Sequence, residues 1–287
     1  MRKPIVPAAL ALAVIILAAA RPFNAPVKVT LLDAVRERWI TLEAQSTGGN
    51  SEECVTLKIK NTSGKPLQLT VEPATVFNTE DNSDQDILVT RPTDVLVQAG
   101  QTTTAKAFGF CCQASNGLSN EGDRMIAEAC KSPKLAETAR YLAAKKYDPD
   151  LQQHAIWAVS DNHSIGGIYS DNRLQCDDLR GFTAGLLGQP VPNYDLDYGY
   201  ELNTPFVFAP KTLSGSMQYK VIKPGRASLQ VFDPEGELYQ VFYDNRYMES
   251  GNYTQRFSLT ATGMIPGAYV VKLIIDGMEW QVQTITV

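Results

Sequence analysis

The chain has 287 residues, a formal net charge of −5 and only two histidines, and 44% of its residues are hydrophobic. An acidic chain without a cluster of lysines and arginines lacks the basic surface that binds nucleic acid, so a nucleic-acid partner is excluded. The length fits two domains, or three small ones.

The N-terminus has the pattern of a secretory signal peptide. Positive charges at Arg2 and Lys3 precede an apolar run from Ile5 to Ala20 that ends in three alanines. This pattern predicts a signal peptide over residues 1–20. Because the run approaches the ~18 residues that span a membrane, an uncleaved anchor is the alternative. We expect an exported protein with no membrane span after cleavage, located outside the cell or at its surface, with the periplasm as the alternative.

The remaining sequence predicts a mainly β protein with a helical segment. Short strands follow one another between turn clusters; in one of them Val55, Leu57 and Ile59 alternate with polar residues. The predicted organisation is an N-terminal β-sandwich over 26–112, a helical segment of two or three helices packed on it over 113–189, a linker over 190–216 and a C-terminal immunoglobulin-like β-sandwich over 217–287.

The helical segment contains two clear start signals. Ser132-Pro133 and Asp148-Pro149 each combine a capping residue with proline at the first helical position. The stretch between Cys112 and Cys130 reads as a polar loop, and a third helix is expected from Leu174 to Leu187.

The helix that begins at Asp148 is the clearest of the three. At 100° per residue its apolar stripe comprises Leu151, Ala155, Ala158 and Val159. Gln152 lies at the edge of the stripe, whereas Gln153, His154 and Trp157 are expected to face elsewhere.

Two parts of the chain resemble known bacterial families. The phrases NTSGKPL at 61–67, TVF at 75–77, AGQT at 99–102, FCC at 110–112 and AIWAVSD at 155–161 resemble bacterial secreted domains, and the resemblance covers roughly 31–168. It implies a secreted β-sandwich and no particular activity.

The C-terminal part resembles the immunoglobulin-like domains of exported Bacteroidetes proteins, some of which are sorting signals for type IX secretion. The motif is VFDPEGE, then Gly251, then PGAYVVKL with Pro266, Gly267 and Tyr269. The final QVQTITV lacks the lysine usual in those signals. In the same region, Asp276-Gly277 between apolar strands predicts a type I′ hairpin.

A third resemblance concerns chemistry. Gram-positive thioester adhesins place a cysteine at the end of an aromatic strand and a glutamine in a motif resembling Gln-x-Ala-Ile-Trp. Phe110-Cys111-Cys112 and the run from Gln153 to Trp157 look similar, although the spacing between cysteine and glutamine is much shorter here. The resemblance implies an internal thioester between Cys111 or Cys112 and Gln153, an acyl donor for a surface amine. The helical wheel favours Gln152 instead.

In an exported chain the cysteines are first of all disulfide candidates. There are five of them, so two bonds and one free thiol are expected. Because neighbouring residues of a strand point to opposite faces, one of the adjacent pair should face the core and the other should be reachable. The preferred pairing is Cys112 with Cys130, and Cys54 with Cys111 or Cys176.

Two acidic loops are candidates for calcium, because hard cations bind clustered oxygen ligands. The candidates are Asn82, Asp84 and Asp86 in one loop and Asp195 and Asp197 in the linker. Neither has the full spacing of a known calcium loop, so the alternative is a solvated acidic loop and no cofactor.

An enzymatic role has little support. Ser160, Asp161 and His163 supply the residue types of a hydrolytic triad, but they lie within four positions and no nucleophile-elbow motif is present. We therefore predict a binding or structural protein without catalytic activity that contacts a protein or a surface glycan. Tyr194, Tyr198 and Tyr200 either form a contact surface or cover the domain junction. The alternatives are a covalent adhesin and an uncharacterised hydrolase.

Overall fold

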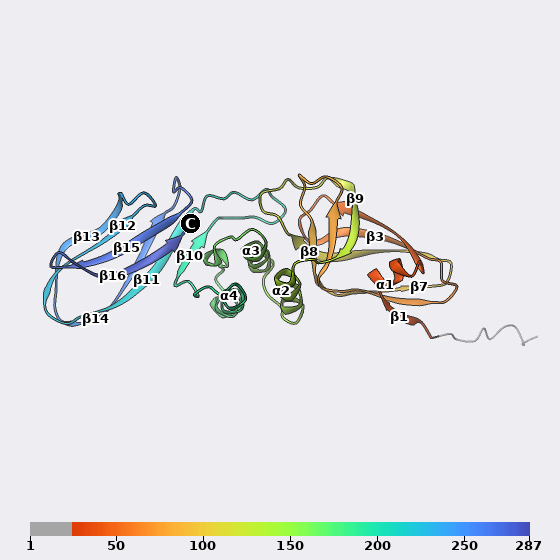
Figure 1. Cartoon of the computed structure of the whole chain (residues 1–287), viewed down its shortest axis with the longest axis horizontal. Helices are drawn as coiled ribbons and strands as arrows, with labels where there is room; N and C mark the ends of the chain where they lie inside the picture. The colour runs from red at the N-terminus through yellow and green to blue at the C-terminus, as the bar shows by residue number, and fades with distance from the viewer. Residues whose placement is uncertain (1–24) are drawn as a thin grey trace, which may run out of the picture.

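The computed structural model describes residues 25–287, so the predicted signal peptide lies outside the described residues. The chain forms three regions in a row: a β-barrel region, a layer of helices, and a region of two sheets that contains the C-terminus (Figure 1). The prediction of a mainly β protein with a helical segment is confirmed. Within residues 25–287 no helix has the length and apolar character to cross a membrane.

The first region contains a closed six-stranded barrel and a separate three-stranded sheet. In barrel order the strands are β2 (Ile40–Thr47), β3 (Ser51–Asn61), β8 (Thr102–Cys111), β6 (Ile87–Arg91), β5 (Thr75–Thr79) and β9 (Glu121–Ala129). The small sheet consists of β1 (Val27–Thr30), β4 (Leu67–Val71) and β7 (Thr93–Val97), and α1 (Leu31–Arg36) follows β1.

Closure of this barrel is the main departure from the predicted sandwich. The stretch that we interpreted as a polar loop contains β9, which pairs with β2 on one side and β5 on the other. In β9 only Met125 is fully buried, so the strand lacks the alternation of apolar residues by which a strand is recognised. Its pairing partners, rather than its own sequence pattern, make it a strand.

The three predicted helices are present. They are α2 (Pro133–Ala143), α3 (Pro149–Ser160) and α4 (Arg173–Leu187), with the short 3-10 helix η1 (Ile165–Gly167) between the last two. The Ser132 side chain accepts a hydrogen bond from the Leu135 amide at the start of α2, as its capping role requires. Helix α3 packs against β8, α2 and α4.

Burial of α3 exceeds the prediction. Every residue from Leu151 to Ala158 is buried, not only the apolar stripe. A helix that is enclosed on all sides belongs to the interior of a fold. Gln152, Gln153 and His154 are therefore core residues, and each needs a polar partner inside the protein.

The C-terminal region consists of two antiparallel sheets. One contains β10 (Tyr194–Asp197), β11 (Thr212–Val221) and β14 (Gly251–Thr260). The other contains β13 (Leu238–Met248), β12 (Gly225–Phe232), β15 (Ala268–Ile275) and β16 (Met278–Thr286). Asp276 and Gly277 have φ angles of 48° and 78°, which fits the predicted type I′ hairpin between β15 and β16.

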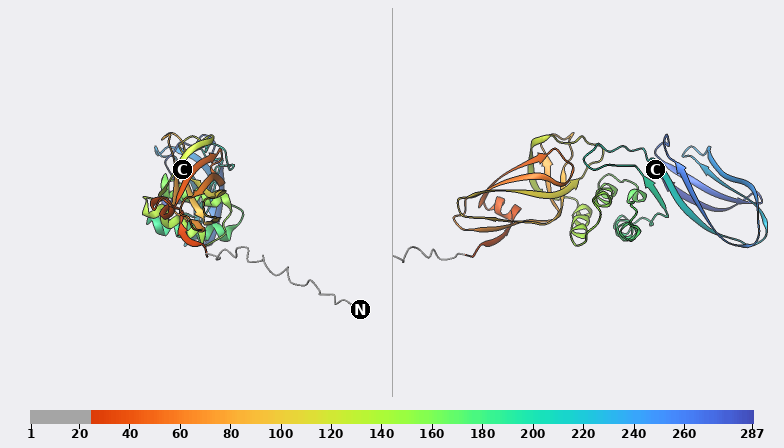
Figure 2. Two further views of the ribbon diagram at one scale, coloured as in Figure 1. Left: turned by 90° about the vertical axis from the view of Figure 1, so that its right-hand side faces the viewer. Right: turned by 180° about the vertical axis from the view of Figure 1, so that it is seen from behind.

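The predicted linker connects all three regions. Its first part forms β10 at the edge of the C-terminal sheet, and residues 198–211 then run out along the helices to the barrel and back, which both orientations in Figures 1 and 2 show. We call residues 198–208 the junction segment. It carries Tyr198, Tyr200 and Phe206 onto the face of α3 that the barrel and the other helices leave open.

Candidate functional site

The centre of the candidate site is the contact between Cys111 and Gln153. Cys111 is the last residue of β8, and Gln153 lies in the second turn of α3. The side-chain nitrogen of Gln153 donates a hydrogen bond to the Cys111 carbonyl over 2.9 Å. Both residues are fully buried, and the Gln153 side-chain oxygen has no hydrogen-bond partner within residues 25–287. The structure thus places the Gln153 carboxamide against Cys111, a residue that lies 42 positions earlier in the chain.

The Cys111 thiol is held from a second side. The indole nitrogen of Trp157, one turn after Gln153, donates to the Cys111 sulfur over 3.1 Å. The Cys111 amide donates to the Asn50 carbonyl over 2.8 Å. Cys111, Gln153 and Trp157 therefore form one buried contact in which the sulfur and the carboxamide have fixed positions.

Electrostatics keep this thiol protonated. Burial raises the pKa of Cys111 above its ordinary value, and hydrogen bonds from Trp157 and then Gln153 only partly oppose the effect. A buried, protonated thiol reacts poorly with oxidants and electrophiles in solution.

The neighbouring residues Gln152 and Cys112 take other positions. The Gln152 side chain donates to the Tyr147 carbonyl over 2.9 Å and accepts from the Thr90 hydroxyl over 3.4 Å, so its role is structural. Cys112 lies in the core between the barrel and the helices, whereas Cys111 lies in the other core cluster. The adjacent cysteines do face opposite sides, but neither is reachable from solvent.

The predicted disulfides are absent from the structure. All five cysteines are in the described part of the chain and all are unpaired thiols: Cys54, Cys111, Cys112, Cys130 and Cys176. Four of the thiols form separate hydrogen bonds, for example Cys54 to the Gly109 carbonyl over 3.6 Å and Cys130 to the Ser132 carbonyl over 3.4 Å. The prediction of two disulfide bonds and one free thiol followed from the expected export of the chain, and the structure contradicts it.

The junction segment covers the pair with aromatic rings. The Trp157 ring lies 5.0 Å from Tyr200 and 4.6 Å from Phe206, measured between ring centroids. The predicted tyrosines Tyr194 and Tyr198 are buried too, so they cover the junction instead of forming an exposed contact surface. The aromatic rings of the junction segment exclude water from Cys111 and Gln153.

A reciprocal pair of hydrogen bonds holds the junction segment against the barrel. The Asn50 amide donates to the Asn203 side-chain oxygen and the Asn203 amide donates to the Asn50 side-chain oxygen, both over 3.0 Å. The Asn50 side chain also donates to the Tyr200 hydroxyl over 3.3 Å. Sequence reasoning missed both asparagines, because their partners are 153 residues apart in the chain. The only feature of the sequence near either asparagine is the cluster of turn residues around Asn50, which predicts a turn and no contact with residue 203.

The buried His154 and the partly buried His163 predict a pH-dependent stability. Burial lowers the pKa of His154 to about 3 and that of His163 to about 4, and each has an unpartnered ring nitrogen. Because the unfolded chain protonates near pH 6.5, stability is complete above that pH and is lost as the pH falls toward the folded values. Between pH 7 and pH 5 we expect a loss of about 2 kcal/mol per histidine.

The test compares urea unfolding of the wild type and of His154→Phe at pH 7 and pH 5. The variant should lose less stability between the two pH values than the wild type does. An equal loss in both proteins would contradict the assignment of a buried neutral His154.

The other predicted site residues do not assemble into a metal or hydrolase centre. Within residues 25–287 no three histidine, cysteine or acidic side chains come together as a metal site requires. Asp86 accepts hydrogen bonds from the Thr79 amide and the Gln113 side chain, and Asn82 and Asp84 accept through backbone carbonyls from Asn116. Asp197 accepts from the Gly199 amide.

Of the triad candidates, Ser160 donates to the Asp161 carboxylate over 2.7 Å. No hydrogen bond within the described chain joins the His163 side chain to either residue. A serine without a base cannot act as the nucleophile of a hydrolytic triad.

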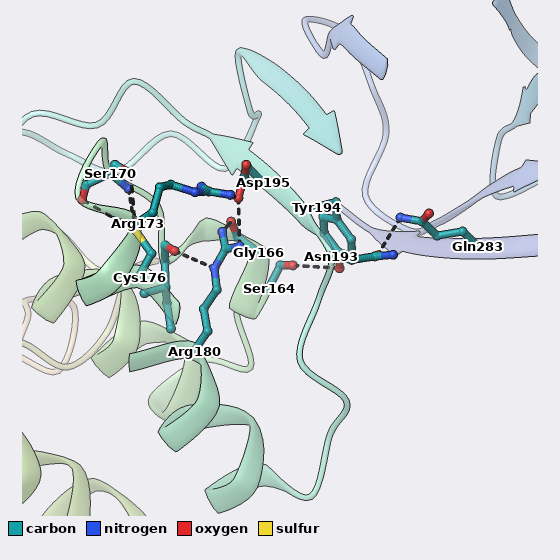
Figure 3. Close-up of polar contacts among 11 residues, drawn as sticks. Ser164, Gly166, Ser170, Arg173, Cys176, Arg180, Asn193, Tyr194, Asp195 and Gln283 are labelled. Atoms are coloured by element: carbon teal, nitrogen blue, oxygen red, sulfur yellow. Dashed lines mark hydrogen bonds and ion pairs between the residues drawn. The ribbon is translucent and has the colours of Figure 1, made fainter. Parts of the chain in front are cut away.

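Asp195, the remaining calcium candidate, belongs to an ion-pair network at the C-terminal junction, shown in Figure 3. The buried guanidinium of Arg180 pairs with Asp195 at 2.8 Å and donates to the carbonyls of Gly166 and Ile168, each over 2.7 Å. Arg173 pairs with the same carboxylate at 3.1 Å. The network ties α4 and η1 to β10 and so fixes the C-terminal sheets relative to the helices.

Comparisons with protein-family models, with curated proteins and with solved structures found no match to this chain.

Proposed function

We propose that this chain is an extracellular or cell-surface binding protein that attaches covalently to its partner through an internal thioester between Cys111 and Gln153. The observation that carries the proposal is the buried hydrogen bond from the Gln153 side chain to the Cys111 carbonyl, together with the hydrogen bond from the Trp157 indole to the Cys111 sulfur. The predicted signal peptide and the resemblance to thioester adhesins support it.

The chemistry balances without a cofactor. The Cys111 sulfur attacks the side-chain carbonyl carbon of Gln153, the carbon–nitrogen bond breaks, and the thiol proton leaves with the amide nitrogen as ammonia. A primary amine of the partner then attacks the same carbon. The carbon–sulfur bond breaks, the sulfur takes the proton of the amine, and an amide joins the partner to residue 153. Each molecule reacts once, so the protein is not an enzyme in the sense of turnover.

The fold suits this reaction. A thioester hydrolyses in water, and the buried pair under the junction segment is shielded from it. The unpartnered Gln153 side-chain oxygen becomes the carbonyl oxygen of the thioester, which needs no donor in the resting state. We also propose that the two-sheet C-terminal region is the immunoglobulin-like domain predicted from the sequence and that it supports the reactive region.

The test uses a fluorescent primary amine, dansylcadaverine, incubated with the full chain purified without its signal peptide. Wild type should retain the label through denaturing electrophoresis, and peptide mapping should place it on residue 153. The Cys111→Ser variant should stay unlabelled, and Cys112→Ser, the matched control, should label as the wild type does. Labelling that persists in Cys111→Ser, or that maps elsewhere, would refute the thioester.

A further inference from the structure

A polar pocket lies where the helices meet the C-terminal sheets, apart from the candidate thioester. Its volume of about 570 Å³ is in the range of small-ligand sites. One wall is the start of α4, where Arg173 is the first residue, and the other is the sheet of β10, β11 and β14. Neither Cys111 nor Gln153 lines the pocket. A ligand bound here contacts the helices and a C-terminal sheet at once.

The sheet wall of this pocket presents short hydroxyl side chains. Leu213 and Met217 of β11 face the core, so Ser214 and Ser216, at the alternate positions, face outward. Ser258 of β14 pairs directly with Ser214. All three serines line the pocket, and their hydroxyls have no hydrogen-bond partner within residues 25–287. Each hydroxyl can therefore donate to a ligand and accept from it.

The cations around this pocket outnumber its carboxylate. Asp195, the carboxylate in the lining, already pairs with the buried Arg180 at 2.8 Å. Arg173 lies 3.1 Å from the same carboxylate. Arg256, which is opposite Ser216 in the strand register, forms no ion pair within the described part of the chain. The pocket is therefore positive in a chain whose formal net charge is −5, and it attracts anions.

Buried polar side chains hold two of the lining residues in place (Figure 3). Gln283 is only 9% exposed, and its amide nitrogen donates to the side-chain oxygen of the exposed Asn193 over 2.7 Å. This bond fixes the Asn193 amide, whose nitrogen remains a donor beside the Ser216 carbonyl. The buried Arg180 orients Asp195 in the same way. Because burying polar groups costs free energy and an asparagine that contacts only water needs no such support, this arrangement indicates a preorganised binding site.

We propose that this pocket binds a sugar that carries a carboxylate. Arg256 pairs with the carboxylate of the sugar, and Arg173 adds to the attraction. Asp195 and Asn193 bond hydroxyl groups of the sugar ring, the first as an acceptor and the second as a donor. The site is separate from the Cys111–Gln153 pair and does not depend on the thioester.

A sugar matches the pocket better than a simple anion does. The neutral lining groups are three hydroxyls and an amide, which recognise hydroxyl groups rather than charge. Ser214 and Ser216 are two residues apart along β11, about 7 Å. One sugar ring therefore reaches from the carboxylate-binding Arg256, opposite Ser216, to the pair of serines at 214 and 258.

The first experiment titrates the full chain, purified without its signal peptide, with glucuronic acid, glucose and acetate, and follows binding by isothermal titration calorimetry. Glucuronic acid should bind at least about tenfold more tightly than glucose, which lacks the carboxylate, and than acetate, which lacks the ring. Equal binding of glucose would remove the role of the arginines, and equal binding of acetate would leave an anion site without a sugar. Either result, or no saturable binding of glucuronic acid, would overturn the proposal.

Substitutions in the same titration place the ligand. Arg256→Met should weaken glucuronic acid binding at least about tenfold. Arg246→Met, the matched control, removes an exposed arginine of β13 outside the pocket and should leave the affinity within about twofold. Ser214→Ala should weaken glucuronic acid about threefold and leave acetate unchanged, because only the ring contacts that hydroxyl. Cys111→Ser should bind as the wild type does, which separates this site from the thioester. Unchanged affinity in Arg256→Met would overturn the proposal.

Discussion

The Gln153→Ala variant is expected to lose covalent amine attachment completely and to keep a protonated Cys111 thiol, whereas Gln152→Ala is expected to attach amine as the wild type does. Gln153 is the residue whose carboxamide contacts Cys111, and without it no acyl group is available to the sulfur. Gln152 instead bridges Tyr147 and Thr90. Its loss leaves these groups unpaired and should cost about 1–3 kcal/mol of folding free energy without removing the acyl donor.

The isosteric change Gln153→Glu separates chemistry from packing. A carboxylic acid has nearly the shape of the carboxamide, but its leaving group would be water, and condensation with a thiol then needs activation that this site lacks. The measurement is the intact mass of each variant with and without methylamine. Attachment of methylamine by Gln153→Ala, or its absence in a folded Gln152→Ala, would contradict the assignment.

The Arg180→Met variant is expected to be strongly destabilised, by about 3–5 kcal/mol. The Arg180 side chain is 3% exposed, and its removal leaves two buried carbonyls without their donor and leaves the Asp195 carboxylate with Arg173 as its remaining ion-pair partner. Methionine fills the volume but supplies no donor. The measurement is the midpoint of urea unfolding together with limited proteolysis, because loss of this tie should expose the linker to cleavage between α4 and β11.

Arg173 supplies a matched control for that change. It pairs with the same carboxylate but is 53% exposed, so Arg173→Met should cost no more than about 1 kcal/mol. Equal effects of the two substitutions would show that the ion pairs do not account for the stability of this junction, and would contradict the role given to Arg180.

Local patterns predicted the helices, the hairpin and the β-rich class because each depends on neighbouring residues. The capping serine at 132 and the Asp276-Gly277 turn act within a few positions, so their signals are present in the sequence itself. The strand β9 has no such signal. Its polar residues form a strand because β2 and β5 offer pairing partners from distant parts of the chain.

The helical wheel misplaced Gln153 for a physical reason. It assumes that a helix has one buried face, but α3 is enclosed by the barrel, by α2 and α4, and by the junction segment. The resemblance to the Gln-x-Ala-Ile-Trp motif selected Gln153, the glutamine that contacts Cys111. The helical wheel selected Gln152, which instead bonds Tyr147 and Thr90. Asn50 and Asn203 were beyond sequence reasoning, because only the fold brings them to the site.

The central claim is the bond between Cys111 and Gln153, and the intact mass of the purified mature protein tests it most directly. We expect a resting mass lower than the sequence mass by one ammonia, and one thiol fewer than the five cysteines supply in denaturing alkylation at acidic pH. Methylamine should raise the mass by one bound molecule and release the fifth thiol. A full sequence mass with five alkylated thiols and no response to methylamine would contradict the account.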